Sequence, residues 1–154
     1  ALPIFCIFEI SRGMWMYHTL AYASKQGARY TIVHGVNCKS STVLGNNCQA
    51  RLSQIGQVIK DAGVGLDPGL TNLSFTSLGG GTFNCTLQAT TGGSCQSNAY
   101  WPPDDGLSNL PGAQVAIQVG TPFTSALSLL WPGSAPVKFG LFYFPASSTD
   151  RMQF

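Results

Sequence analysis

The first 34 residues constrain the fold more than any other part of the chain. They read ALPIFCIFEISRGMWMYHTLAYASKQGARYTIVH, without proline after Pro3. Apolar residues occupy every face near the start, and the segment becomes amphipathic only after about Leu20. The pattern predicts one helix that ends near His34 and Gly35, and it would be roughly 50 Å long at the standard rise per residue.

The start of this helix is hydrophobic on all sides, and such a helix has to be buried in lipid or among other proteins. The rest of the 154-residue chain is too short to surround it and also to build a core of its own. We therefore expect residues 1 to about 20 to meet copies of the same chain or a membrane.

Two ionisable residues, Glu9 and Arg12, interrupt the apolar run. A membrane-spanning helix needs about 20 apolar residues with few charges. Because the two residues lie at i and i+3, they share a helical face and are expected to pair. In the alternative interpretation they are the water-side end of a short anchor. The predicted assembly interface comprises Phe5, Phe8, Glu9, Arg12, Trp15 and Met16.

Small residues recur further along the helix, as Ala23 with Gly27 and Ser24 with Ala28. Small residues four positions apart let two helix backbones approach closely, as in helix dimers. Packing of the helix on the chain's own sheet accounts for the same pattern. Both interpretations stay open at the level of sequence.

Composition favours an extracellular protein. Charged residues make up only 9% of the chain, against about 25% in an ordinary soluble protein. The net charge of +2 is too small to indicate nucleic acid or an acidic surface as a partner. Glycine and the polar uncharged residues replace the missing charges, which suits the outside of a cell.

The cysteines agree with an oxidising compartment. Cys38 with Cys48 and Cys85 with Cys95 form two pairs with the same separation of ten residues. Four cysteines permit three connectivities, and locality favours these two pairs. No zinc-site spacing is present, so disulfides are the better interpretation. Cys6, inside the hydrophobic helix, is expected to be a buried free thiol.

The remaining residues, 36–154, are predicted to form a globular head after an assembly helix at 1–35. A second helix is expected at about residues 48–62, with Asn47 as its N-cap and Gly63 as its stop. Leu52, Ile55, Val58 and Ile59 would form its apolar stripe.

Alternating apolar and polar residues predict strands at 70–78, 113–120 and 137–144. Three glycines at 79–81 should end the first of these strands. We predict that residues 82–105 form a surface loop held by a disulfide, and that residues 122–131 form a short helix. Three or more antiparallel strands with a helix across one face make an α+β fold.

Three local patterns then point to a family. The apolar start leads into Glu9-Ile10-Ser11-Arg12, a later run closes in Gly27-Ala28-Arg29-Tyr30, and Ala146-Ser147-Ser148-Thr149-Asp150-Arg151 follows the last predicted strand. Together they resemble the TadE-like family of pilin-related proteins from bacterial tight-adherence pilus systems. The segment between Gly35 and Leu110 matches nothing in that pattern.

The resemblance implies a pilin-like fold, with the long helix packed on a small β-containing head, and export through an inner membrane by assembly machinery. It also implies a homopolymer, in which Glu9 meets the N-terminal amine of a neighbouring subunit. Arg12 is an equally good partner for Glu9. The apolar run before Glu9 has eight residues, fewer than expected for the family's membrane segment. Either cleavage close to Ala1 or missing upstream residues would explain this.

No enzyme signature is present, and we expect neither catalysis nor a cofactor. Asp104-Asp105 is better explained as a solvated turn than as a calcium site, and His18 and His34 as packing or capping residues. Asn72-Leu73-Ser74 and Asn84-Cys85-Thr86 fit the N-glycosylation acceptor pattern and mark candidate exposed positions.

The sequence therefore favours a structural subunit of an extracellular pilus-like filament on the cell surface, polymerised through its first 30 or so residues. One alternative is a minor pseudopilin of a Tad-type pilus or secretion apparatus. Another is a membrane-anchored binding module, whose head recognises a surface glycan or a protein through Tyr100, Trp101 and Trp131.

Overall fold

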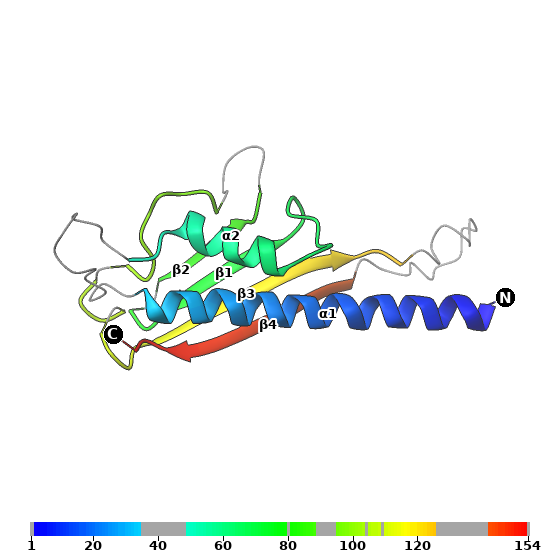
Figure 1. Cartoon of the computed structure of the whole chain (residues 1–154), viewed down its shortest axis with the longest axis horizontal. Helices are drawn as coiled ribbons and strands as arrows, with labels where there is room; N and C mark the ends of the chain where they lie inside the picture. The colour runs from blue at the N-terminus through cyan, green and yellow to red at the C-terminus, as the bar shows by residue number, and fades with distance from the viewer. Residues whose placement is uncertain are drawn as a thin grey trace.

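The computed structural model describes residues 2–34, 49–79, 81–88, 95–103, 105–108, 110–125 and 142–153. These residues form two helices, α1 (Leu2–Val33) and α2 (Leu52–Ala62), and four strands. The strands are β1 (Asn72–Ser77), β2 (Thr82–Thr86), β3 (Gln114–Phe123) and β4 (Phe142–Arg151). Figure 1 shows both helices on one face of the sheet.

The strands form one antiparallel sheet in the order β2-β1-β3-β4. Phe75 at the centre of β1 lies opposite Phe83 of β2 and Ile117 of β3. Leu73 and Phe75 point into the core, whereas Asn72 points to the other face. The α+β fold, with a helix across one face of an antiparallel sheet, is therefore confirmed.

The second half of α1 belongs to the core of the head. From Leu20 onward one face of the helix is buried, as the change to an amphipathic pattern predicted, whereas Tyr22 and Val33 are exposed. A Cβ added at Gly27 would come within 2.7 Å of Ile59 Cγ1 on α2, so the two helices touch there. The small residues Ala23, Ser24, Gly27 and Ala28 thus let α1 pack on its own chain.

Helix α2 begins later than predicted. Its N-cap is Arg51, whose backbone N–H donates to Gln54 Oε1 at 3.0 Å, and Asn47 lies outside the described residues. The predicted stop is confirmed, because the N–H of Gly63 donates to the Ile59 carbonyl at 2.8 Å. The apolar stripe is buried, apart from Val58, which is only partly covered.

Two predictions about which residues form strands are wrong next to β1 and β3. Residues 82–86, expected in a surface loop, form the edge strand β2. Its side chains are mostly exposed, so its sequence shows no alternation of apolar and polar residues. The helix expected from Pro122 does not begin there, because β3 runs on to Phe123. Since β1 pairs with β3 only as far as Gly120, the missing N–H of Pro122 costs no hydrogen bond to β1.

Strand β4 runs to Arg151, well past the predicted end at Phe144. The pattern that begins at Ala146 therefore lies within this strand and does not follow it. It escaped detection because its residues are mostly small and polar, and only one side of the strand packs against the helices. Ala146 is buried on that side, whereas Ser147 and Thr149 are exposed.

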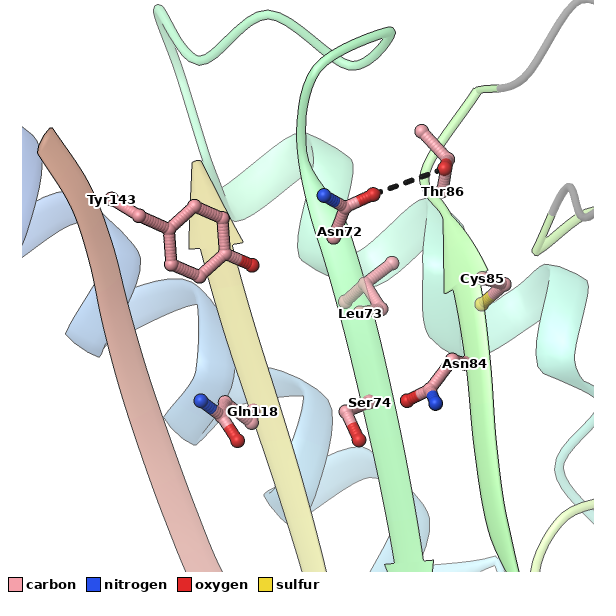
Figure 2. A pocket seen from close by; sticks show the side chains of 8 residues that line it. All are labelled: Asn72, Leu73, Ser74, Asn84, Cys85, Thr86, Gln118 and Tyr143. Atoms are coloured by element: carbon pink, nitrogen blue, oxygen red, sulfur yellow. Dashed lines mark hydrogen bonds between the residues drawn. The ribbon is translucent and has the colours of Figure 1, made fainter. Parts of the chain in front are cut away.

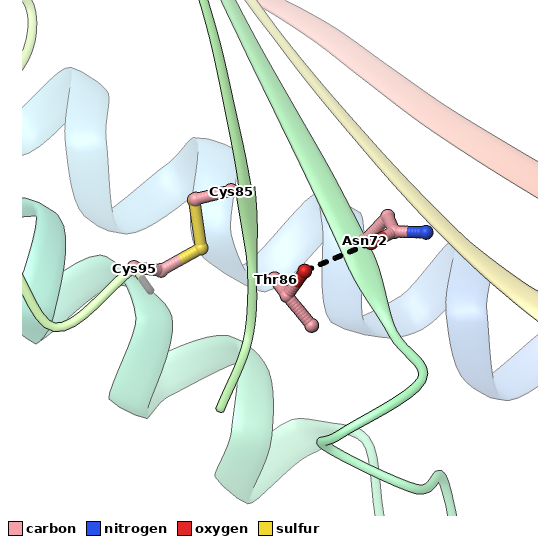
Figure 3. Close-up of a disulfide and its surroundings, with 4 residues drawn as sticks. All are labelled: Asn72, Cys85, Thr86 and Cys95. Atoms are coloured by element: carbon pink, nitrogen blue, oxygen red, sulfur yellow. Dashed lines mark hydrogen bonds between the residues drawn. A yellow bond between two sulfur atoms is a disulfide. The ribbon is translucent and has the colours of Figure 1, made fainter. Parts of the chain in front are cut away.

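The disulfide between Cys85 and Cys95 is confirmed (Figure 3). It ties β2 to the segment that follows residue 94, and both cysteines are buried. Cys95 packs next to α2, since a Cβ at Gly56 would lie 3.5 Å from the Cys95 Cβ. The predicted pair Cys38 with Cys48 lies outside the described residues.

Candidate assembly surface on the N-terminal helix

The first turns of α1 extend beyond the described strands of the head (Figure 1). Residues 3–8 and Ile10 are exposed, including Ile7 at 64% and Phe8 at 71%. Phe5 and Ile4 are exposed as well. Because a helix turns through about 100° per residue, these positions lie on every side of it.

An apolar surface of this kind is unusual for a soluble monomer. Single exposed apolar side chains are normal, but a contiguous apolar patch usually marks an interaction site. Here the patch wraps around a helix, so no single flat partner would cover it.

Glu9 and Arg12 lie where the exposed turns meet the head. Arg12 Nη1 is 3.4 Å from Glu9 Oε1, so the predicted pair along the helix forms. Arg12 Nη2 also donates to the Thr124 carbonyl at 3.1 Å, and the guanidinium lies 4.8 Å from the centre of the Phe123 ring. Arg12 thereby fastens α1 to the end of β3.

Two aromatic rings support the helix directly after this pair. Phe123 and Phe144 pack with their centroids 5.4 Å apart, and a Cβ at Gly13 would lie 3.8 Å from Phe144 Cζ. Trp15 lies against the backbone of Gly65, which has a positive φ of 83°. A side chain at Gly65 would collide with the indole.

The six predicted interface residues differ in how far the structure exposes them. Phe8 is largely exposed, and Phe5 and Trp15 are each about half-exposed. Glu9 and Met16 are partly buried in their own chain, and Arg12 already has partners there. Sequence reasoning left out three further exposed apolar residues of the same run, although the all-round pattern contains them: Ile4, Ile7 and Ile10.

The expectation of a buried thiol at Cys6 is wrong for the single chain. Cys6 is free and exposed, because the turns around it have no partner within the described residues of the head. Its burial was inferred from the apolar residues beside it. Those residues are themselves exposed in the single chain, so Cys6 is exposed with them.

The other candidate residues have structural roles. Trp101 is only 4% exposed and packs 5.1 Å from the Phe75 ring, so it presents no face to a ligand. Tyr100 lies under the Arg51 guanidinium, and Trp131 is outside the described residues. His34 stacks on Tyr30 with ring centroids 4.1 Å apart.

Asp105 holds a turn together. Its carboxylate accepts the Ser108 hydroxyl at 2.6 Å and the backbone N–H groups of Ser108 and Leu107. These hydrogen bonds, that of the Ser108 side chain first, lower the pKa of Asp105 below its ordinary value. Asp104 lies outside the described residues, and the described part of the chain contains no cluster of three or more metal-binding side chains.

Among the described residues, no helix combines the length and the hydropathy needed to cross a bilayer. Comparison of the chain with protein-family models, with curated proteins and with solved structures finds no match.

Proposed function

We propose that this chain is the structural subunit of an extracellular pilus-like filament, polymerised through the first half of α1. One observation carries the proposal. Within a single helix, residues 3–8 and Ile10 are exposed on all sides and form what we call the rod, whereas one face of the helix from Leu20 onward is buried in the head. The rod is helical and exposed, and the described residues of its own chain do not cover it.

The energetics of this surface favour several neighbours at once. Complete burial of one large apolar side chain contributes about 1.5–3 kcal/mol. Association costs about 4–15 kcal/mol in lost freedom and ordering. A helix that touches one partner along one stripe buries only part of its surface. A helix surrounded by copies of itself buries all sides, which favours a bundle over a simple dimer.

The boundary at Glu9 and Arg12 fits this role. Arg12 is tied to the Thr124 carbonyl, so the pair holds the rod in a fixed direction relative to the head. A fixed direction matters for a filament, because every subunit has to repeat the same contact. The resemblance to TadE-like pilins supports the same role, with inner-membrane machinery that delivers the subunit to the cell surface.

The proposal is tested with two substitutions at equally exposed apolar positions. Ile7→Gln alters the rod, whereas Leu78→Gln alters the turn after β1, where Leu78 is 62% exposed. Glutamine is a good helix former, so Ile7→Gln should leave α1 intact. We expect the original chain and the Leu78 variant to form filaments in detergent-free buffer, seen by negative-stain electron microscopy and by sedimentation. The Ile7 variant should stay soluble.

Two outcomes would contradict the proposal. One is an original chain that remains monomeric without detergent at all concentrations tested. The other is an Ile7 variant that assembles in the same yield and form as the Leu78 variant.

A further inference from the structure

The face of the sheet that points away from the helices carries a hollow without charged side chains. It measures about 480 Å³, within the range of about 300–1,000 Å³ typical of small-molecule sites. Figure 2 shows it across β1, β2 and β3, with one side chain from β4. Its lining residues are Asn72, Leu73, Ser74, Asn84, Cys85, Thr86, Gln118 and Tyr143.

One wall of the hollow is an aromatic ring that lies across β3. Tyr143 is 49% exposed, and Figure 2 shows its hydroxyl directed toward β1. The ring passes over Gly120, where any Cβ would overlap the phenol. Glycine at this position is therefore what allows the tyrosine to lie flat over the sheet.

The floor offers hydrogen-bonding groups that the protein itself does not use. The side-chain amides of Asn84 and Gln118 have no hydrogen-bond partner among the described residues. Ser74 lies opposite both of them in the sheet register. An amide carries donors and an acceptor on one planar group. These side chains can therefore donate hydrogen bonds to hydroxyl groups of a ligand or accept hydrogen bonds from them.

The chemistry of the lining selects the class of ligand. An ion gains little here, because no lining residue carries a charge. A purely apolar ligand would leave the amides desolvated and unpaired, which costs free energy. A sugar has hydroxyl groups for the amides and an apolar C–H face for the tyrosine ring. We propose that this hollow binds a neutral oligosaccharide.

A covalently attached sugar is the rival explanation, because two acceptor triplets begin at Asn72 and Asn84 on this face. The contacts favour reversible binding. The Thr86 hydroxyl donates to Asn72 Oδ1 at 3.1 Å, across the strands, so it is not directed at Asn84 of its own triplet. Both asparagines also lie in strands that are paired in the sheet.

The test measures binding of three neutral trisaccharides, made of glucose, mannose or N-acetylglucosamine, to the full chain. The chain is kept monomeric in a detergent without a sugar headgroup, and binding is followed by calorimetry and saturation-transfer NMR. We expect Tyr143→Ala and Gln118→Ala each to weaken binding of the preferred trisaccharide by about tenfold or more. Tyr100→Ala is the control, because Tyr100 is similarly exposed, at 40%, but lies outside the hollow.

Gln118→Ala keeps the test decisive if the Tyr143 variant fails to fold, since Gln118 is an exposed side chain on a central strand. Three results would overturn the proposal. These are no binding of any trisaccharide at millimolar concentration, equal weakening by Tyr100→Ala, or a peptide mass map that shows a sugar attached at Asn72 or Asn84 in the purified chain.

Discussion

The two halves of α1 differ in both sequence and surroundings. The first half carries large apolar residues on every side, and its first turns extend beyond the described strands. The second half carries small residues at Ala23, Ser24, Gly27 and Ala28, and it is buried against α2 and the sheet. Small residues bring the backbones together, whereas the large side chains of the first turns, such as Ile7 and Phe8, are exposed. The distribution of small residues therefore shows which half packs on its own chain.

The largest expected difference between the halves comes from truncating one large side chain in each. Leu20→Ala removes a side chain that is 0% exposed, and it should lower the free energy of unfolding by about 2–5 kcal/mol. Ile7→Ala removes an exposed one and should change it by less than about 0.5 kcal/mol. Urea unfolding of the monomer in mild detergent measures both. Equal losses would mean that the first half is also part of the folded core.

Removing the disulfide separates the stability of the head from assembly. Replacing Cys85 and Cys95 together by serine should cost about 2–3 kcal/mol, because the bond closes a short loop in the unfolded chain. The rod is not touched, so filaments should still form below the lowered melting temperature. Calorimetry and electron microscopy of the double variant check the two parts. If the head stays folded but filaments no longer form, the disulfide region takes part in assembly, which would contradict assembly through the start of α1 alone.

The two glycines of α1 provide a matched pair in the same helix. Gly27→Ala places a methyl group 2.7 Å from Ile59 Cγ1, and this overlap should outweigh the gain in helix propensity, for a net loss of about 1 kcal/mol. Gly13→Ala meets only ordinary contacts, the nearest at 3.8 Å from Phe144. It should therefore stabilise the chain by up to about 1 kcal/mol. Thermal melts with the same sign for both variants would contradict the close packing at Gly27.

The smallest effect on folding is expected at the boundary between the halves. Glu9→Gln removes the pair with Arg12, but Arg12 is partly exposed and keeps its bond to the Thr124 carbonyl. The monomer should lose no more than about 0.5 kcal/mol. Assembly should nevertheless slow, because the charge of Arg12 would enter the bundle without its neighbour. Light scattering follows this rate, and an unchanged rate would remove Glu9 from the mechanism.

Sequence reasoning succeeded where local pattern decides structure. It placed α1, the end of α2 at Gly63, the alternation of β1 and the bond between Cys85 and Cys95. It missed β2 and most of β4, because edge strands with polar side chains carry no apolar signal.

Of the candidate sites, too, only the part set by local pattern could be predicted from the sequence. The apolar start of α1 is visible in the sequence, so the exposed rod around Phe5 and Phe8 follows from it. The contacts of Arg12 with Thr124 and Phe123 join residues more than one hundred positions apart, so no local pattern contains them. The hollow under Tyr143 also depends on long-range strand pairing, and it lies away from the aromatic residues that the sequence suggested.

The most direct test of the central claim is the rate at which a small maleimide modifies Cys6 as the chain concentration is raised. Cys6 lies in the middle of the exposed turns and is free and exposed in the single chain. A Cys6→Ser variant provides the background from any other thiol. If copies of the chain cover these turns, the Cys6-specific rate should fall by about tenfold or more once filaments form, and it should recover when detergent dissolves them. A rate that stays the same in monomer and filament would show that assembly, where it occurs, does not use this surface.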